Sequence, residues 1–294
     1  MSTLTRAPRT SAAAAKVSSK RKTRVWALVV WVVVAFFFLN LIGLIASVVV
    51  DSLGSKWFNT WLPQGFTFHW YSDAWRDFGL SSVLLVTLEV AAVVVLLSVV
   101  IGVPASYALA RREFPGKRIV MLLFVLPILV PPITYGIPLA TVLYKVHLAG
   151  SLSGVILANL VPSVPFVILT MTPFIEQIDP KIESAARMCG ARTTAIFTRI
   201  LAPLLIPGIL AACILVLVRT VGMFELTYLT AGPNSTTLVV ALYNSVFAAG
   251  IRANQSVDAM ATIYTGSMLV LLVIALRYVN PTQLVTRGRE EPGR

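Results

Sequence analysis

The chain has 294 residues, of which 57% are hydrophobic and only 12% are charged. A soluble domain carries about 25% charged residues, so the composition excludes an ordinary soluble protein and indicates a membrane protein. The net charge of +12 does not indicate a nucleic-acid-binding protein, because the basic residues lie between apolar runs rather than on one soluble face.

The N-terminal residues 1–24 are rich in Ser, Thr, Ala and basic residues and contain no acidic residue. This composition predicts a disordered tail, and its positive charge is expected to keep it in the cytoplasm. The basic residues serve either as a topology signal alone or also as a contact with anionic lipid.

Six runs are long and apolar enough to predict transmembrane helices, since a spanning helix needs about 20 residues. The first, residues 25–50, is too long for the core of a signal peptide and is read as a retained anchor helix. An external loop, residues 51–79, follows, and then a core of five spans within residues 80–280. These five predicted spans are residues 80–108, 119–143, 154–172, 204–224 and 260–279.

The loop charges predict an orientation with both ends inside the cell. Lys and Arg are frequent in the tail, in the stretch "RREFPGKR", in the segment 179–203 and after the last span, and they are sparse in the alternate loops. By the positive-inside rule, the rich loops are cytoplasmic, and so is the C-terminal tail, residues 281–294. The expected fold class is an all-α membrane protein with six transmembrane helices, N-in and C-in.

Ionisable residues inside predicted spans are costly and often functional. Glu89 lies in the second span and Arg219 in the fifth. Each either forms a structural hydrogen bond or lines a translocation path. Their estimated depths differ by only about 6 Å on a helical rise of about 1.5 Å per residue, so the two are expected to face one cavity, as a pair or around a shared solute. The alternative places them on opposite sides of the bundle.

The stretch "LVPPITYGIP", residues 129–138, predicts a break in the third span. Its three prolines and one glycine free backbone groups, which is tolerated where a cavity or a protein neighbour satisfies them. The break is either a simple kink or part of the path, and Tyr135 within it is a candidate path residue. Glu225, just after the fifth span, is another.

Residues 179–203 are predicted to form a short cationic helix–turn–helix. Asp179 can cap the start of a helix with Pro180 in its first position, and Gly190 can end that helix in a left-handed conformation. A second helix from about Arg192 leads into the fifth span, at whose start Pro203 is tolerated. This geometry suits a lever that a partner grips and that is tied stiffly to a transmembrane helix.

The same segment resembles the EAA loop of type I ABC-importer permeases. That pattern is approximately Glu-Ala-Ala, three residues, Gly, nine residues, Ile, one residue, Leu-Pro. Ser184 stands where the motif has Glu, with Glu183 just before it, and Ala202 replaces Leu. By this resemblance, the residues expected to couple the chain to an ATPase are Glu183, Ser184, Ala185, Ala186, Gly190, Ala191, Ile200 and Pro203.

The resemblance covers about residues 66–283. "SYALARREFPGKR" is similar to the family's second cytoplasmic loop, and "TAGPNSTTLVVALYNSVFAAG" to the re-entrant stretch before the last span. The resemblance implies a multi-pass subunit of an ATP-driven importer in the bacterial cytoplasmic (inner) membrane. Its partners would be a second permease subunit or a second copy, two ATP-binding subunits and an extracytoplasmic solute-binding protein.

The solute stays open among polyamine, ferric iron, phosphonate and sugar. The stretch "TAGPNSTTLVVALYNSVFAAG" favours the branch of the family that transports polyamine, iron and phosphonate. A polyamine would require carboxylates, but Pro132, Gly222 and Met223 occupy the places where the acidic residues are expected.

The sequence offers no chemistry of its own. It contains no phosphate-binding loop of the type G-x-x-x-x-G-K-[ST], no metal-ligand spacing and no cluster of catalytic residues, and its two cysteines are expected to be free thiols. We therefore expect no enzyme activity, no catalytic or metal-binding residues and no cofactor in this chain, with ATP on a partner subunit. The alternative is a stand-alone secondary transporter or channel, which would predict inverted repeats and charged relays.

Overall fold

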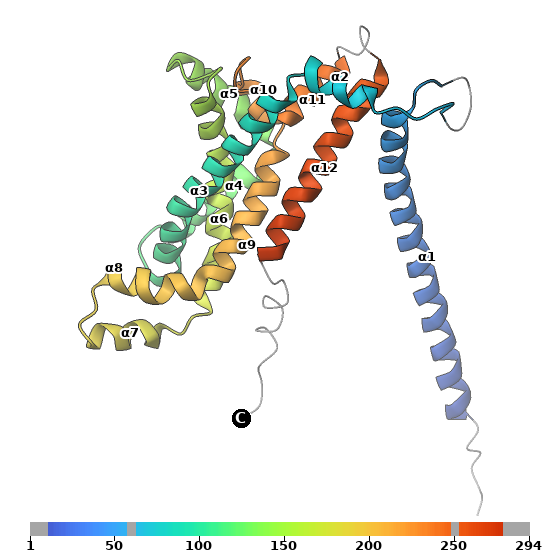
Figure 1. Cartoon of the computed structure of the whole chain (residues 1–294). Coiled ribbons are helices and arrows are strands. Elements are labelled where there is room, and N and C mark those ends of the chain that lie inside the picture. Colours follow the sequence, from blue (N-terminus) through green and yellow to red (C-terminus); the bar gives the residue numbers. More distant parts are fainter. Residues whose placement is uncertain (1–10, 58–62, 248–252, 279–294) are drawn as a thin grey trace, which may run out of the picture. The chain divides into compact units, whose positions relative to one another are not determined.

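A computed structural model describes residues 11–57, 63–247 and 253–278 of the chain, and there it consists of helices joined by turns with one isolated β-bridge. The chain divides into two compact units, residues 1–67 and 68–294 (Figure 1). Each unit is described by itself. The predicted C-terminal tail, 281–294, lies outside the described residues.

The first unit is dominated by α1 (Ser11–Leu53), whose residues 26–53 are long and apolar enough to cross a membrane. The predicted first span, residues 25–50, thus coincides with a helix of sufficient apolar length. Residues 11–24 of the tail that is predicted to be disordered are helical in the structure. Four successive alanines, the strongest helix formers, continue a helix that the apolar run has already nucleated. Residues 1–10 lie outside the described part.

The predicted external loop 51–79 is partly helical. After α1 a bridge pairs Gly54 with Phe66, and in the second unit α2 (His69–Asp77) precedes the next span. Ala74 of α2 is fully buried against Leu80 and Met260. The helix is therefore packed on the bundle through an amphipathic face that the composition of the loop does not reveal.

Three long helices form the centre of the second unit: α3 (Leu80–Arg111), α6 (Leu152–Glu176) and α9 (Ala202–Val221). Small residues bring them close together, as is typical of membrane helices. A Cβ on Gly102 of α3 would stand 2.7 Å from Val167 Cγ1 of α6, so only glycine allows this approach. The shared core includes Val94, Met171 and Val216.

The predicted third span, residues 119–143, is not one helix. It consists of α4 (Lys117–Leu129) and α5 (Pro132–Lys145), which are bent by 100° relative to each other. Val130 and Pro131 are extended, with ψ near 130°, because each of them precedes a proline and is pushed out of the helical region. The described part thus has five unbroken candidate spans, or up to six if the bent pair counts as one.

The last part of the chain forms α10 (Glu225–Thr230), α11 (Leu238–Phe247) and α12 (Asn254–Tyr278). The predicted last span, 260–279, begins earlier than expected, at Asn254. The turn between α10 and α11 lies against another loop, since Gly150 N donates to Thr230 O over 2.8 Å. Together with α2, the helices α10 and α11 lie at one end of the unit (Figure 1).

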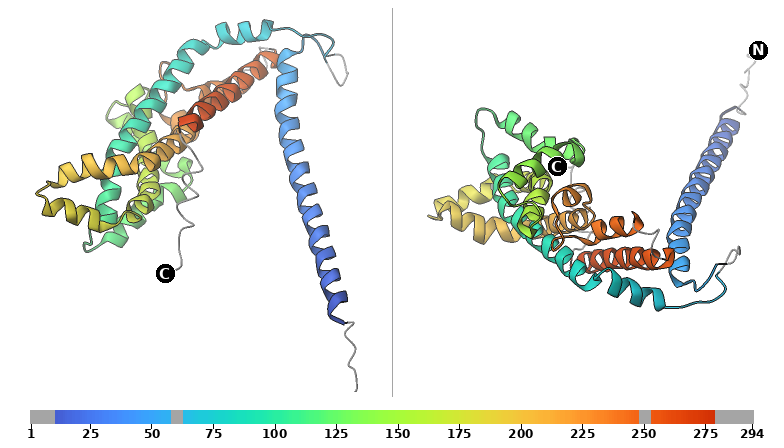
Figure 2. Two further views of the ribbon diagram at one scale, coloured as in Figure 1. Left: turned by 60° about the horizontal axis from the view of Figure 1, so that its bottom comes forward. Right: turned by 90° about the horizontal axis from the view of Figure 1, so that it is seen from above.

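The opposite end carries α7 (Pro180–Met188), α8 (Thr193–Ile196) and a short π-helix, η1 (Phe197–Leu201). Both views in Figure 2 show this group of short helices projecting from the bundle. The long helices separate this projection from the end formed by α2, α10 and α11, so the second unit has two distinct ends.

Candidate functional site

The projection at residues 179–203, called the arm below, is a helix–turn–helix that leads directly into a span. Its second half, α8 and η1, continues into α9. Residues 193–221 together are long and apolar enough to form one candidate membrane span. The predicted helix–turn–helix is therefore confirmed. A force on the arm acts on a helix of the bundle core without an intervening flexible loop.

The first helix of the arm starts as predicted. Asp179 is the N-cap residue, and its Oδ1 accepts a hydrogen bond of 2.9 Å from Lys181 N, while Pro180 occupies the first helical position. A cap of this kind stabilises a helix by about 1 kcal/mol. It fixes where α7 begins relative to the end of α6.

Gly190 ends α7 in a Schellman motif. Its φ is +83°, Gly190 N donates to Arg187 O over 2.9 Å, and Ala191 N donates to Ala186 O over 3.1 Å. Such a pair of bonds satisfies the last carbonyls of a helix and needs a left-handed residue between them. The sequence-based role of Gly190 as a helix stop is confirmed.

The members of the motif lie on two faces of the arm. Ala186 and Ala191 pack against the hydrophobic core, and Ile200 is half-buried. The exposed members are Ser184, Ala185, Gly190 and Pro203, and the neighbouring Met188 is 85% exposed. The small side chains of Ala186 and Ala191 thus let the arm lie close to the bundle, while the outer face of α7 is exposed in the isolated chain.

Glu183 does not belong to the outer face. Its side chain is only 6% exposed, and its Oε1 lies 2.8 Å from Nε of Arg111 at the end of α3, as an ion pair rather than an aligned hydrogen bond. Arg111 Nη2 also donates to Ile178 O, in the connection between α6 and α7. The residue that was expected to meet a partner therefore faces its own chain.

Tyr107, one turn before Arg111, contacts both halves of the arm. Its hydroxyl donates to Glu183 Oε2 over 2.7 Å, and its ring meets Phe197 of η1 edge-on at 5.5 Å between centroids. Removing one partner from a buried ion pair costs about 3–5 kcal/mol. Tyr107 and Arg111 lie in the stretch "SYALARREFPGKR" that resembles the family's second cytoplasmic loop, but nothing in the order of residues shows that the end of α3 meets the arm.

The candidate path residues Glu89 and Arg219 are not paired. Within the described residues, no ion pair joins them. Arg219 is half-buried, and its guanidinium carbon lies 5.5 Å from the centre of the Phe166 ring of α6. Glu89 is exposed on the same side of α3 as Leu85 and Leu96. The direct pairing considered from the sequence is thus absent from the described part of this chain.

Tyr135 and Glu225 lie on neighbouring helices. The hydroxyl group of Tyr135 is buried and makes no hydrogen bond within the described residues, and Tyr135 packs against a cluster that contains Met223 and Leu226. Gly136 lets α5 approach α10, since a Cβ there would stand 2.9 Å from Leu229 Cδ1. Two of the four candidate path residues thus come from helices that pack against each other.

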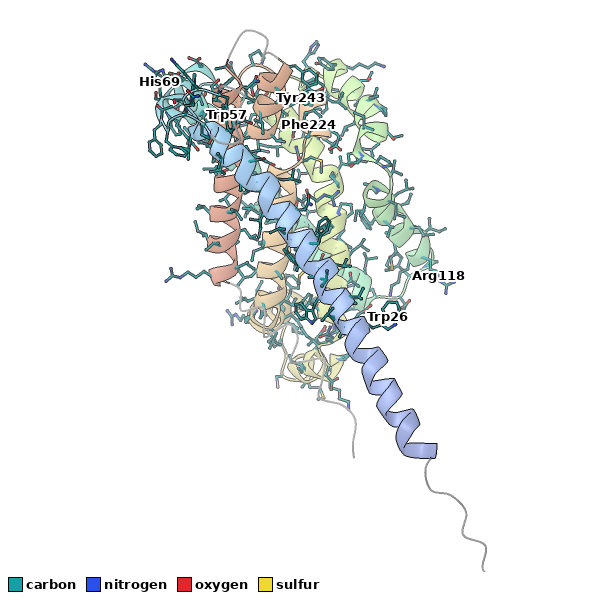
Figure 3. All side chains as sticks on the ribbon, turned by 90° about the vertical axis from the view of Figure 1, so that its right-hand side faces the viewer. Trp26, Trp57, His69, Arg118, Phe224 and Tyr243 are labelled. Atoms are coloured by element: carbon teal, nitrogen blue, oxygen red, sulfur yellow. The ribbon has the colours of Figure 1, made fainter. Side chains whose placement is uncertain are left out.

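Four aromatic rings lie beside Glu225 and were not predicted as a site. Phe224 and Tyr243 are 4.6 Å apart between ring centroids and lie side by side in Figure 3. Tyr228 stacks on Phe224 at 5.2 Å, and Phe247 lies 4.6 Å from Tyr243. The two rings of each pair, Phe224 with Tyr228 and Tyr243 with Phe247, are four residues apart, but nothing in the sequence shows that the two pairs meet.

Residues 98–284 match the family model described as the binding-protein-dependent transport system inner membrane component. The trehalose transport system permease protein SugB of Mycobacterium tuberculosis is 30% identical over 220 residues, which are 74% of this chain and 80% of that protein. The chain belongs to this family. The permease is thus a type I ABC importer subunit, as its resemblance to the EAA loop implied.

Other relatives agree with this membership. The molybdenum transport system permease protein ModB of Escherichia coli is 30% identical to the permease over 55% of this chain and 78% of that protein. A bacterial ABC transporter involved in the import of the acidic polysaccharide alginate has a chain with a TM-score of 0.72 and 19% identity, covering 88% of this chain and 98% of that chain. The fold is therefore that of ABC importer permeases.

Proposed function

We propose that the permease forms half of the translocation path of an ATP-driven solute importer and receives ATPase motion through the arm. The observation that carries this proposal is the construction of the arm. A Schellman turn at Gly190 follows a helix whose outer face is exposed in the isolated chain, and the second half of the arm continues into α9. ATP binds to a partner subunit, and the permease itself performs no chemistry.

The proposed assembly contains this chain, a second permease or a second copy, two ATP-binding subunits and an extracytoplasmic solute-binding protein. The family description, a component of binding-protein-dependent transport systems, supports the last of these. So does the similarity to the alginate transporter that was solved in complex with an alginate pentasaccharide-bound periplasmic protein. The outer face of α7 is the part that we expect the ATPase to grip.

The permease is a multi-pass membrane protein, and we place it in the bacterial cytoplasmic membrane with both ends inside. The distribution of Lys and Arg supports this orientation. It puts the arm in the cytoplasm, where an ATPase can reach it, and α2, α10 and α11 outside, where a binding protein can reach them.

The proposed path residues are Tyr135, Arg219 and Glu225, with Glu89 on the exposed side of α3. The support is that α5, which carries Tyr135, packs against α10, which begins at Glu225, and that the buried hydroxyl group of Tyr135 makes no hydrogen bond within the described part of the chain. The relatives' names give trehalose, molybdenum and sulfate as solutes. These solutes range from a neutral sugar to oxyanions, and the path combines a positive and a negative side chain with aromatic rings.

Co-purification tests the proposed function. The full-length permease, carrying a C-terminal affinity tag, is isolated from mild-detergent extracts of its native membrane, and its companions are identified by mass spectrometry. We expect an ATP-binding subunit in a ratio of two per pair of permeases. If the chain is isolated without an ATPase and moves solutes by itself in vesicles, the alternative of a stand-alone transporter or channel replaces the proposal.

A further inference from the structure

We propose that the ion pair between Arg111 and Glu183 is the joint that passes movement of the arm to α3. In the proposed function the arm drives α9, with which it is continuous. The joint transmits the movement of the arm to a second helix, α3. Arg111, Glu183 and Tyr107 are then positioning residues for coupling. This inference rests on the proposed function.

The location of the pair is the first argument. Among the residues that the structure describes, the other ion pairs lie three or four residues apart along the chain, as in Asp73 with Arg76 or Glu113 with Lys117. Within the same described ranges, only the pair of Arg111 and Glu183 joins two helices that are distant in sequence. It does so at the base of the arm, where α7 leaves the bundle.

The number of attachments is the second argument. Arg111 holds Glu183 through its Nε and Ile178 O through its Nη2. Tyr107 adds a hydrogen bond to Glu183 and a ring contact to Phe197, on the other half of the arm. The end of α3 is thus tied to the start of the arm, to α7 and to η1 at once, so the arm cannot rotate without pulling on α3.

The reach of α3 is the third argument. Val90, Val94 and Val103 of α3 belong to the buried core together with residues of α6 and α9. The same helix carries Glu89 far from the arm. A movement applied at Arg111 is therefore transmitted along a packed helix to the region of the proposed path, since packed interiors transmit strain.

The chemistry of the pair explains why a charged contact serves this purpose. An apolar contact of similar area would hold α7 as firmly but would let it slide. A guanidinium group offers a planar fork of donors with fixed directions, and both charges are buried, with exposed fractions of 12% and 6%. The pair therefore fixes one orientation of α7 relative to α3.

The test measures how α3 responds to nucleotide in the complete complex. The permease is reconstituted into vesicles with its ATPase and binding-protein partners, with an environment-sensitive fluorophore on a single cysteine at Val100 of α3, which is 59% exposed. The compound added to trigger the response is ATP with vanadate. With Glu183→Gln or Arg111→Met, we expect the fluorescence response to fall by about five-fold or more, while ATP hydrolysis and subunit composition persist.

Glu113→Gln is the matched control. It removes an ion pair of the same length, 2.8 Å, in which the Glu113 side chain is 89% exposed, and it should leave the response unchanged. The exchange of Arg111→Glu with Glu183→Arg should restore part of the response. A pair that only stabilised the fold would reduce assembly or hydrolysis instead, and an unchanged response in the assembled Glu183→Gln complex would overturn the joint.

Tyr107→Phe keeps the experiment decisive if the charge variants fail to assemble. It removes the hydrogen bond to Glu183 and retains the ring contact with Phe197, so it should assemble and show a reduced response. A full response with Tyr107→Phe would then count against the joint. The absence of any response at Val100 of α3 in the unmodified complex would also overturn the joint. A complex that takes up no solute when it is given ATP would instead contradict the proposed function, which is a different result.

Discussion

At Gly190 the backbone is held at a φ of +83°, which other residues rarely adopt. We expect Gly190→Pro to insert normally but to uncouple transport from ATP hydrolysis, because proline fixes φ near −65° and has no N–H to donate to Arg187 O. The measurement is solute uptake and ATP hydrolysis in the same vesicles, with a loss of uptake of about ten-fold or more, comparable to other allosteric couplings.

Gly116 supplies the control for that substitution. It has a φ of +85° in the turn before α4, and a Cβ added at either glycine would meet nothing within 4 Å. Gly116→Pro introduces comparable strain outside the arm. If uptake falls equally in both variants, the effect comes from local strain rather than from the arm, and the coupling role of Gly190 is contradicted.

Arg219 and Glu89 are predicted to act separately on the solute. Arg219 has the Phe166 ring as its neighbour, and Glu89 is exposed on the face of α3, where a charge in an apolar span needs water or protein around it. Arg219→Gln and Glu89→Gln should each reduce uptake, measured as initial rate, while Leu96→Ala on the same face of α3 should not. Full uptake by both neutralised variants would remove these residues from the path.

At the scale of elements, a buried hydrogen bond ties α6 to α10. Asn159 Nδ2 donates to Thr227 Oγ1 over 3.2 Å and to Val155 O over 2.9 Å. We expect Thr227→Val to lower stability by about 0.6–1.5 kcal/mol, which corresponds to about 1–6 °C in melting temperature for a domain of this size. Thermal unfolding of the purified permease in detergent measures it.

Thr170→Val is the comparison for that variant. The hydroxyl of Thr170 donates to Phe166 O within its own helix, over 2.8 Å, so the loss of this bond breaks no contact between helices. If the melting temperature falls as much with Thr170→Val as with Thr227→Val, the hydrogen bond between α6 and α10 contributes no more to stability than one within a single helix.

The elements themselves are largely predictable from local patterns. Apolar length locates the spans, Asp179 and Gly190 locate the ends of α7, and the prolines near residue 131 locate the break. The size of the bend, 100°, is not predictable, because it depends on how α4 and α5 pack. The helical start at Ser11 is not predictable from composition alone, because the same polar residues are compatible with disorder and with the extension of a neighbouring helix.

The candidate site is predictable only in part, for a reason that concerns distance along the chain. The turn at Gly190 depends on neighbouring residues, and the local sequence reveals it. The contact of Glu183 with Arg111 and Tyr107 depends on the folded arrangement of α3 and α7. The resemblance to a family motif assigns Glu183 to a partner, and the structure places it on the inner face of the arm.

At the scale of the whole molecule, the orientation in the membrane is open to a direct test. Gly116 and Asn234 lie in turns between helices, and Thr194 lies in α8 on the arm. We expect cysteines at Gly116 and Thr194 to be shielded from an impermeant thiol reagent in intact cells, and a cysteine at Asn234 to react. The reason is the distribution of Lys and Arg between the two sides. Both native cysteines are first replaced, by Ser at 189 and by Ala at 213.

Permeabilised cells provide the control for accessibility, since all three cysteines should then react. Labelling of Gly116→Cys or Thr194→Cys from outside would reverse the predicted topology. It would also place the arm where no ATPase can reach it.

The π-helix η1 affects the orientation of α7 relative to the helices of the bundle. A π-turn contains one residue more than an α-turn, so rewinding η1 (Phe197–Leu201) into α-helix would rotate α7 about the axis of α9 by about 100° and shift it by about 1.5 Å. Such a rotation would draw Glu183 away from Arg111. The extra residue and the ion pair therefore belong to the same state of the permease. We expect deletion of Thr198 to convert η1 into α-helix and to break the ion pair between Glu183 and Arg111. If Glu183 in that variant is still protected from a carboxyl-modifying reagent, the connection between η1 and the ion pair is disproved.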